Sequence, residues 1–176
     1  MTGRHLVTTS LEETWPASGP VLFLGEWCRS YARREVWEPL DAEVVPFHWG
    51  DGERRLEDFG SIEGRYRDRL REFAELLNDA HGVDHDDRYW RILIGPWLFR
   101  AISVLWDRWT SIMTAAATEV IDTRVLPLDP ATAVPVDLGD FGRLTTVPIG
   151  NHHLYSQILR RFTDVELHEV DAPVTG

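Results

Sequence analysis

The stretch Val21-Leu22-Phe23-Leu24-Gly25 decides the fold class of this 176-residue chain. A short, continuous apolar run that follows Pro20 and ends in a glycine is typical of a strand covered on both faces, as in a parallel sheet. The segment 43–49 predicts a second strand. Its last residues are not expected in a central ladder, because Pro46 has no backbone N–H to donate.

Helical periodicity appears in the middle of the chain. Within residues 53–80, apolar side chains recur at i, i+4, i+7 and i+11, which predicts an amphipathic helix: Tyr66, Leu70, Phe73 and Leu77. A second helix is predicted to run to about Ala116, with Pro96 in its first turn. Its apolar residues cover more than one stripe, so we expect it to be largely buried.

Strands and helices also alternate in the remaining part of the chain. A strand, a helix and a strand are predicted at 119–123, 151–162 and 164–170. Between the first two, residues 126–142 carry closely spaced prolines and glycines and are predicted to form a loop. Alternation of strands and helices favours a three-layer α/β unit with a mostly parallel sheet, and the length fits a single domain over residues 1–176.

Composition excludes several classes of function. The chain has 29 acidic and 18 basic residues, and its net charge of −11 argues against a nucleic-acid partner. Every basic residue is arginine, so lysine Schiff-base chemistry and lysine-based phosphate loops are absent. Cys28 is the single cysteine, which rules out an intramolecular disulfide and a cysteine zinc cluster.

The sequence predicts no membrane-spanning or secretory segment. The most apolar stretch, 92–106, is interrupted by Gly95-Pro96 and Arg100, and it is shorter than the ~20 residues that a membrane span needs. No apolar core follows the first ten residues, so we expect no secretory signal. A cytoplasmic location is therefore expected, with peripheral contact at the inner face of the membrane left open.

Two polar and aromatic clusters follow the first two predicted strands. Glu26 and Trp27 follow one strand, and His48, Trp49 and Asp51 follow the other, so all five are expected at the carboxyl edge of the sheet. We predict that the carboxylates and the imidazole act as acids or bases, and that the two indoles are stacking platforms for a ring. The alternative is structural: buried indoles, a glutamate paired with arginine, and a hydrogen-bonded histidine.

Four further residues are candidates for substrate binding. Asn151 is expected to cap the last helix, and His152, next to it, to face a cleft. Arg88 and Arg91 have the fork geometry that binds carboxylates and phosphates. The alternative for the two arginines is pairing with the aspartates just before them. Adjacent histidines do not share a helix face, so we predict no metal site, and nothing in the sequence calls for an organic cofactor.

Several motifs together resemble one known family, that of transferases linked to O-antigen and other surface-carbohydrate biosynthesis in bacteria. The motifs are Phe23-Leu24-Gly25-Glu26-Trp27-Cys28, Val45-Pro46-Phe47-His48-Trp49, Leu77-Asn78 with His81-Gly82-Val83, Arg88-Tyr89-Trp90-Arg91-Ile92-Leu93-Ile94-Gly95-Pro96-Trp97-Leu98, and Asp107-Arg108-Trp109. Their order and spacing hold from about Leu6 to about Phe162.

The resemblance implies a Rossmann-like unit similar to the N-terminal half of a GT-B glycosyltransferase. Members of the family are several times longer, so the chain is expected to be an acceptor-side half or a truncated copy. A nucleotide-sugar donor and a glycan acceptor are the implied partners, and no His-Pro nucleotide element occurs in the chain. The alternative, from a different class, is a non-catalytic module that pairs with a separate C-terminal half or another partner protein through exposed aromatic residues.

Overall fold

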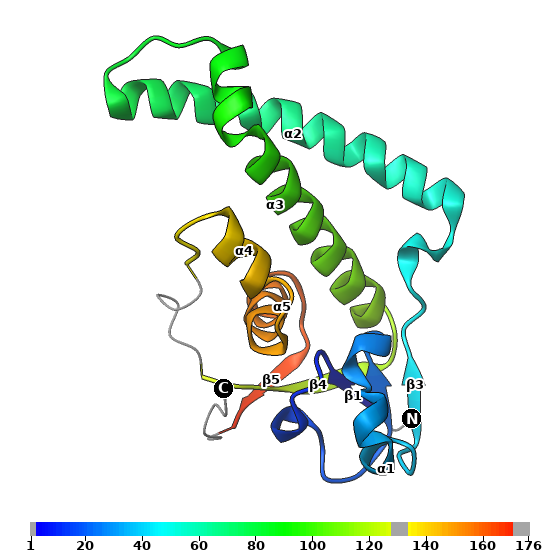
Figure 1. Cartoon of the computed structure of the whole chain (residues 1–176). Helices are drawn as coiled ribbons and strands as arrows, with labels where there is room; N and C mark the ends of the chain where they lie inside the picture. The colour runs from blue at the N-terminus through cyan, green and yellow to red at the C-terminus, as the bar shows by residue number, and fades with distance from the viewer. Residues whose placement is uncertain (1–2, 128–133, 171–176) are drawn as a thin grey trace. The chain divides into compact units, whose positions relative to one another are not determined.

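The computed structural model describes residues 3–127 and 134–170. Five strands in this part of the chain form one sheet, and every pairing between them is parallel. The strands are Arg4–Val7 (β1), Val21–Phe23 (β2), Ala42–Val44 (β3), Val120–Val125 (β4) and Glu166–Glu169 (β5). Their order across the sheet is β3-β2-β1-β4-β5, so β1 lies at the centre (Figure 1).

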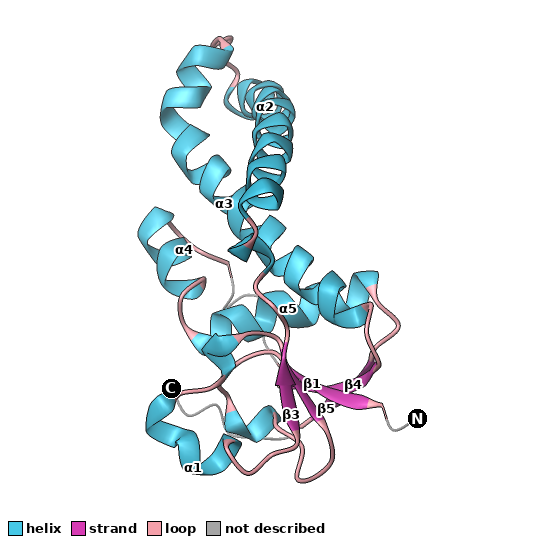
Figure 2. Cartoon of the chain, turned by 90° about the vertical axis from the view of Figure 1, so that its right-hand side faces the viewer, coloured by secondary structure: helices cyan, strands magenta, loops and turns pink. Residues whose placement is uncertain are grey.

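This strand order means that the chain winds outward from β1 in both directions. It passes from β1 to β2 and β3, then returns to the other side of β1 and continues from β4 to β5. Because parallel crossovers are right-handed, the connections of the two halves lie on opposite faces of the sheet. Figures 1 and 2 show α1 (Arg34–Trp37) on one face and α5 (Pro148–Phe162) on the other. The predicted α/β fold with a parallel, Rossmann-like sheet is confirmed.

The position of β2 in the core explains why residues 21–24 are all apolar. Val21, Leu22 and Phe23 are all buried, since β2 is covered on both faces. Tyr155 and Leu159 of α5 belong to the same core cluster and are 1% exposed each. Burying one such large side chain stabilises the fold by about 1.5–3 kcal/mol.

Internal contacts divide the chain into two compact units. One consists of Met1–Phe47 and Arg108–Gly176, and we call it the sheet unit; the other is His48–Asp107, the helical unit. The helical unit contains α2 (Gly52–His81) and most of α3 (Asp87–Ala116). Helix α2 matches the predicted amphipathic helix closely at both ends.

The turn between α2 and α3 is built by local hydrogen bonds. Gly82 ends α2 with φ 65°, the left-handed conformation in which glycine carries no steric penalty. The Asn78 side chain accepts from the backbone N–H of His85 at 3.1 Å and donates to its carbonyl at 2.9 Å. Trp90 Nε1 also donates to Asn78 Oδ1, at 2.9 Å. One asparagine thus ties the end of α2 to the start of α3.

Helix α3 differs from the prediction in two respects. It begins at Asp87, so Pro96 lies inside the helix and not in its first turn. Within the predicted segment, Leu98 and Ile112 are buried, but Leu105 is 47% and Trp109 39% exposed, so the helix is buried only in part.

The sheet contains one strand that the sequence analysis does not predict, the central strand β1. Its first residues, Arg4 and His5, are polar, and this hides the strand from a search for apolar runs. The second predicted strand is shorter than expected, because residues 48–50 form a 3-10 turn. The predictions for 119–123, 151–162 and 164–170 are confirmed as β4, α5 and β5. Helix α4 (Leu138–Leu144) begins within the predicted loop, whose residues 128–133 lie outside the described residues.

Candidate functional site

A groove lies where β2 and β3 end. It has a volume of about 490 Å³ and is lined by Gly25, Glu26, Trp27 and the segment 44–47. Two of the predicted site residues, Glu26 and Trp27, therefore lie in one depression of the sheet unit. The Glu26 carboxylate is exposed and forms an ion pair with Arg29, three residues further on. The rest of the wall is mostly apolar and includes Phe47, which is 55% exposed.

Trp27 is held in place by residues that follow β1 and β2. Its Nε1 donates to the carbonyl of Thr8 at 3.1 Å, at the end of β1. Its ring packs directly on Gly25, where a Cβ would lie 2.2 Å from Trp27 Cζ3. Glycine is required there because the ring approaches the backbone so closely; the φ of −179° is ordinary extended backbone.

A second cavity lies at the carboxyl end of β1, on the other side of Trp27. Its volume is about 310 Å³. It is lined by Thr9, Ser10, Trp27, Arg108, Thr145, Thr146, Pro148, Asn151 and Tyr155. The strand order reverses between β1 and β4, and ligands of open α/β sheets bind beyond the strand ends at such a reversal. We call this the switch-point cavity.

Arg108 is the positive group of the switch-point cavity. Its Nε donates to Asn151 Oδ1 at 2.8 Å and its Nη2 to the carbonyl of Thr145 at 3.2 Å. The guanidinium also lies 5.8 Å from the centre of the Tyr155 ring. These contacts from α5 and the preceding turn fix the plane of the guanidinium.

The two predicted residues of α5 have different roles. Asn151 lines the switch-point cavity, but the N-cap of α5 is Val147, so the predicted capping role was wrong. His152 is fully buried. Its Nε2 accepts from the backbone N–H of Leu126 at 3.1 Å, so Nδ1 carries the proton and donates to Thr8 Oγ1 at 3.3 Å.

His152 therefore acts as a link between the ends of β1 and β4, and it does not face the cleft that the sequence analysis expected. Burial lowers the pKa of His152 from 6.5 to about 4, with a smaller contribution from His153 next to it. The imidazole is thus neutral near neutral pH, as the acceptor role of Nε2 requires.

His48, Trp49 and Asp51 all lie in the helical unit. The buried His48 ring has Nε2 3.3 Å from Asp107 Oδ1, and Trp49 Nε1 donates to Asp58 Oδ2 at 2.9 Å. Asp51 is the N-cap of α2 and accepts from the backbone N–H groups of Glu53 and Arg54. Each of these three residues therefore has a structural role. That they share a groove with Glu26 of the sheet unit stays a prediction.

Arg88 and Arg91 lie in the first turns of α3 and are exposed. They belong to the helical unit and line neither the groove nor the switch-point cavity. Their predicted contact with an anionic group also stays a prediction.

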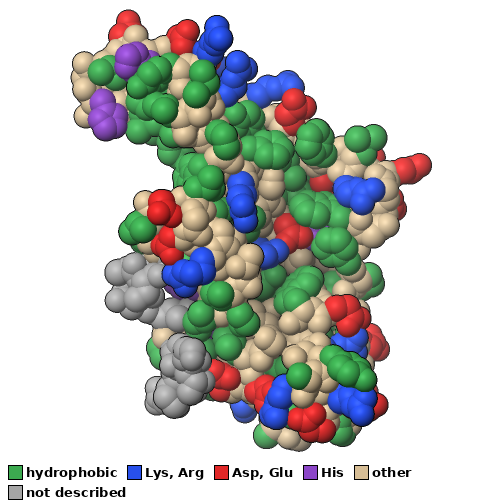
Figure 3. All heavy atoms as spheres, in the orientation of Figure 1, with side chains coloured by type: hydrophobic (Ala, Val, Ile, Leu, Met, Phe, Trp, Pro, Cys, Tyr) green, Lys and Arg blue, Asp and Glu red, His purple; other side chains and the backbone are tan. Residues whose placement is uncertain are grey.

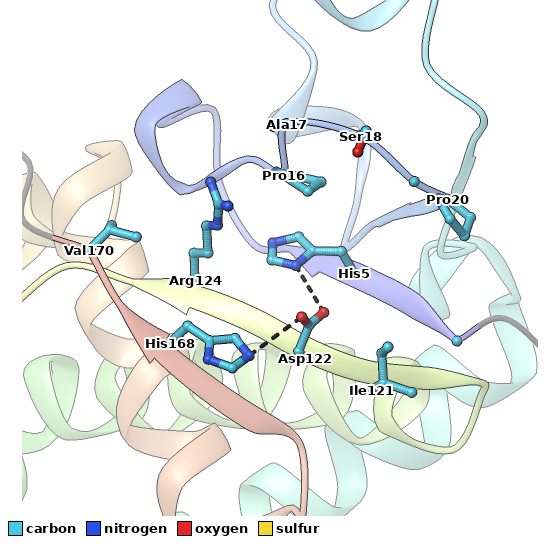
Figure 4. Close-up of a pocket in the computed structure, with 12 residues that line it drawn as sticks. His5, Pro16, Ala17, Ser18, Pro20, Ile121, Asp122, Arg124, His168 and Val170 are labelled. Atoms are coloured by element: carbon cyan, nitrogen blue, oxygen red, sulfur yellow. Dashed lines mark hydrogen bonds and ion pairs between the residues drawn. The ribbon is translucent and has the colours of Figure 1, made fainter.

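A third cavity, of about 690 Å³, lies over β1, β4 and β5, beside the segment 16–20 (Figure 4). Asp122 of β4 stands between two histidines: its Oδ1 is 2.9 Å from His5 Nδ1, and its Oδ2 is 3.5 Å from His168 Nε2. Arg124 donates to the carbonyl of Trp15 at 2.8 Å. These groups already satisfy one another across β1, β4 and β5, which favours a structural role in strand pairing.

Other sources of chemistry are limited in the described part of the chain. Residues 3–127 and 134–170 contain no cluster of three or more His, Cys, Asp or Glu arranged to hold a metal ion. Over the same residues, no helix has the length and apolarity to cross a membrane. Cys28 is buried, and desolvation raises the pKa of its thiol to about 12. It is therefore a small core residue and no activated nucleophile.

Fold and cavities together define a Rossmann-like α/β protein with ligand-sized depressions along the carboxyl edge of its parallel sheet. The family model described as LIC12162 family transferase matches residues 4–175, nearly the whole chain. The protein therefore belongs to this family of transferases. No curated protein and no solved structure matches it.

Sequence reasoning predicted Asn151 as a site residue but missed the hydroxyl groups of the switch-point cavity, which belong to Thr9, Ser10, Thr145 and Thr146. Thr9 and Ser10 lie two and three residues after the end of β1, so recognising that strand would have placed them at the sheet edge. Arg108 stands out in the sequence as a charged residue that lies between Trp106 and Trp109. Its hydrogen-bond partners Thr145 and Asn151 are 37 and 43 residues away in sequence, and no local pattern predicts these contacts.

Proposed function

We propose that the chain is a glycosyl-type transferase, or the acceptor-side half of one in a GT-B arrangement, acting on a bacterial surface-carbohydrate precursor. Membership of a transferase family and a Rossmann-like sheet support this proposal. The observation that carries it is the groove beside β2 and β3, which Glu26, Trp27 and Phe47 line together. A cytoplasmic location, peripheral to the inner face of the membrane, accompanies the proposal.

The groove has the parts that a sugar acceptor needs. Aromatic rings pack against the C–H faces of sugars, and Trp27 and Phe47 supply such surfaces. Glu26 takes the proton of the acceptor hydroxyl while the oxygen of that hydroxyl bonds to the anomeric carbon of the donor sugar. The bond from that carbon to the leaving phosphate breaks, and its electron pair goes to the phosphate oxygen. Arg29 orients the carboxylate through its ion pair.

The test compares two glutamates of the sheet unit. Glu26→Gln removes the proposed base, and Glu35→Gln is the matched control, because Glu35 is also exposed and pairs with a nearby arginine, Arg33, at 3.1 Å. Binding of nucleotide sugars and glycans is measured by saturation-transfer NMR, and transfer by release of the nucleotide. Removing a general base lowers turnover about 10²–10⁴-fold.

We expect Glu26→Gln to lose turnover in this range while keeping its affinity for the acceptor, and Glu35→Gln to behave as wild type. Equal turnover of the two variants would exclude Glu26 as the base. Failure of the wild-type chain to bind any nucleotide sugar or glycan would overturn the proposed function.

A second candidate is a module that binds a partner protein, and the surface of the helical unit favours it. Hydrophobic side chains are exposed along the α2–α3 hairpin (Figure 3), including Leu56, Leu76, Ile92 and Leu93 at 57–73%. Exposed apolar patches of this kind mark interfaces. Co-expression with the product of a neighbouring reading frame tests the candidate: a stable complex that Leu93→Asp disrupts supports it, and the absence of a complex counts against it.

A further inference from the structure

We propose that the switch-point cavity binds the phosphoryl group of a sugar phosphate or a nucleotide. The inference deepens the proposed function and rests on it for the identity of the substrate. Binding of the anion itself does not depend on Glu26, which lies in the groove and not in this cavity.

The charge of the cavity is the first argument. The chain as a whole has 29 acidic residues against 18 basic ones. Among the described residues that line the switch-point cavity, however, there is no aspartate or glutamate, and the one charged side chain is Arg108. The others offer four hydroxyls from threonine and serine, one amide, one phenol and one indole. A positive, hydroxyl-rich depression in an acidic protein selects an anion.

Thr9 provides the second argument. It is 1% exposed, and its Oγ1 has no hydrogen-bond partner within the described part of the chain. A buried hydroxyl without a partner is unfavourable, and native structures usually satisfy such groups with water, an ion or a ligand. Because Thr9 lines the cavity, a ligand oxygen bound there would complete its hydrogen bonding.

Arg108 and α5 provide the third argument. Asn151 and Thr145 accept from Nε and Nη2 of Arg108 and fix the plane of its guanidinium, so the positive charge loses little entropy when an anion binds in the cavity. The first turn of α5, a 15-residue helix, also lines the cavity with Pro148 and Asn151. The positive end of the helix dipole therefore adds to the field of Arg108.

Trp27 connects this cavity to the acceptor groove, because the same side chain lines both. A single ligand can thus place a ring against the indole and its phosphoryl group beside Arg108. The larger cavity of Figure 4 is a poorer anion site, since its Asp122 carboxylate repels anions and its imidazoles are already paired.

The experiment measures binding of four probes to the full chain by isothermal titration calorimetry: inorganic phosphate, glucose 1-phosphate, CMP and acetate. Thr9→Val replaces the hydroxyl with a methyl group of similar size. Thr110→Val is its matched control, because Thr110 is also a buried threonine whose Oγ1 finds no partner in the described residues, and it does not line the cavity. Arg108→Gln removes the positive charge. Arg100→Gln is its control, because Arg100 lies in the same helix, is exposed and does not line the cavity.

We expect the phosphate-bearing probes to bind and acetate to bind at least ten-fold more weakly. Thr9→Val weakens phosphate binding about five-fold or more and Arg108→Gln about ten-fold or more, whereas both controls bind as wild type. Tighter binding of CMP than of glucose 1-phosphate identifies the ligand as a nucleotide, and the reverse identifies a sugar phosphate.

Three results would overturn the inference: no binding of any phosphate probe, equal binding of acetate and phosphate, or unchanged phosphate binding in Thr9→Val and Arg108→Gln. Glu26→Gln separates this inference from the proposed function. That variant should keep phosphate binding. A wild-type chain that binds phosphate without transferring sugar would contradict the transferase mechanism and leave the anion site standing.

Discussion

Protonation of the buried His152 should make the protein less stable at mildly acidic pH. In the folded state its pKa is about 4, against 6.5 in the unfolded chain, because burial disfavours the imidazolium. As the pH falls through 6.5 the unfolded chain takes up the proton first. The contribution of His152 to stability is therefore fully present above pH 6.5 and is lost as the pH falls toward 4.

The two pKa values determine the size of the effect. A shift from 6.5 to about 4 corresponds to about 3 kcal/mol when the titration is complete. Between pH 7.5 and pH 5, the expected loss of the free energy of unfolding from His152 alone is about 2 kcal/mol. His153 adds to it with the same sign, because burial also lowers its pKa.

Urea denaturation followed by circular dichroism at the two pH values measures this loss. His152→Gln should be less stable than wild type at pH 7.5 by about 1–3 kcal/mol, because the Leu126 N–H or the Thr8 hydroxyl loses its partner. It should also lose about 2 kcal/mol less on acidification. His81→Gln, at an exposed histidine, is the control and should follow wild type. An equal loss in wild type and His152→Gln would refute the reasoning.

Three further predictions concern single residues. Cys28 should react with iodoacetamide at pH 8 only after unfolding in urea, because its thiol is buried with a pKa of about 12; rapid labelling of the folded protein would contradict this. Gly25→Ala should cost about 1–3 kcal/mol of stability in urea denaturation and weaken ligand binding measured by calorimetry, because the new methyl group displaces the Trp27 ring. Asp51→Ala should lower the free energy of unfolding by about 1 kcal/mol through loss of the α2 cap, and unchanged stability would argue against that role.

The sequence predicted the elements whose patterns are local. The apolar run before Gly25 indicated a buried parallel strand, and the spacing of Leu70 and Leu77 indicated α2; both are present. Glu26 and Trp27 were correctly expected at a strand end, since a strand followed by a turn places the next residues at the sheet edge. The central strand β1 was not predicted, because it begins with polar residues. One of them, His5, is paired with Asp122, which lies 117 residues away in sequence.

The sequence by itself therefore determined the class of the protein: a parallel α/β sheet, a strongly acidic composition, no lysine chemistry and a single cysteine. Only the tertiary structure decided that Thr9, Arg108 and Asn151 line one cavity and that His152 is buried beside β1. The physical reason is that a parallel sheet joins strands through long crossovers, so the groups that meet at its edge lie far apart in sequence. Their hydrogen bonds, such as the one from His152 to Thr8 across 144 positions, depend on packing that no short window of residues contains.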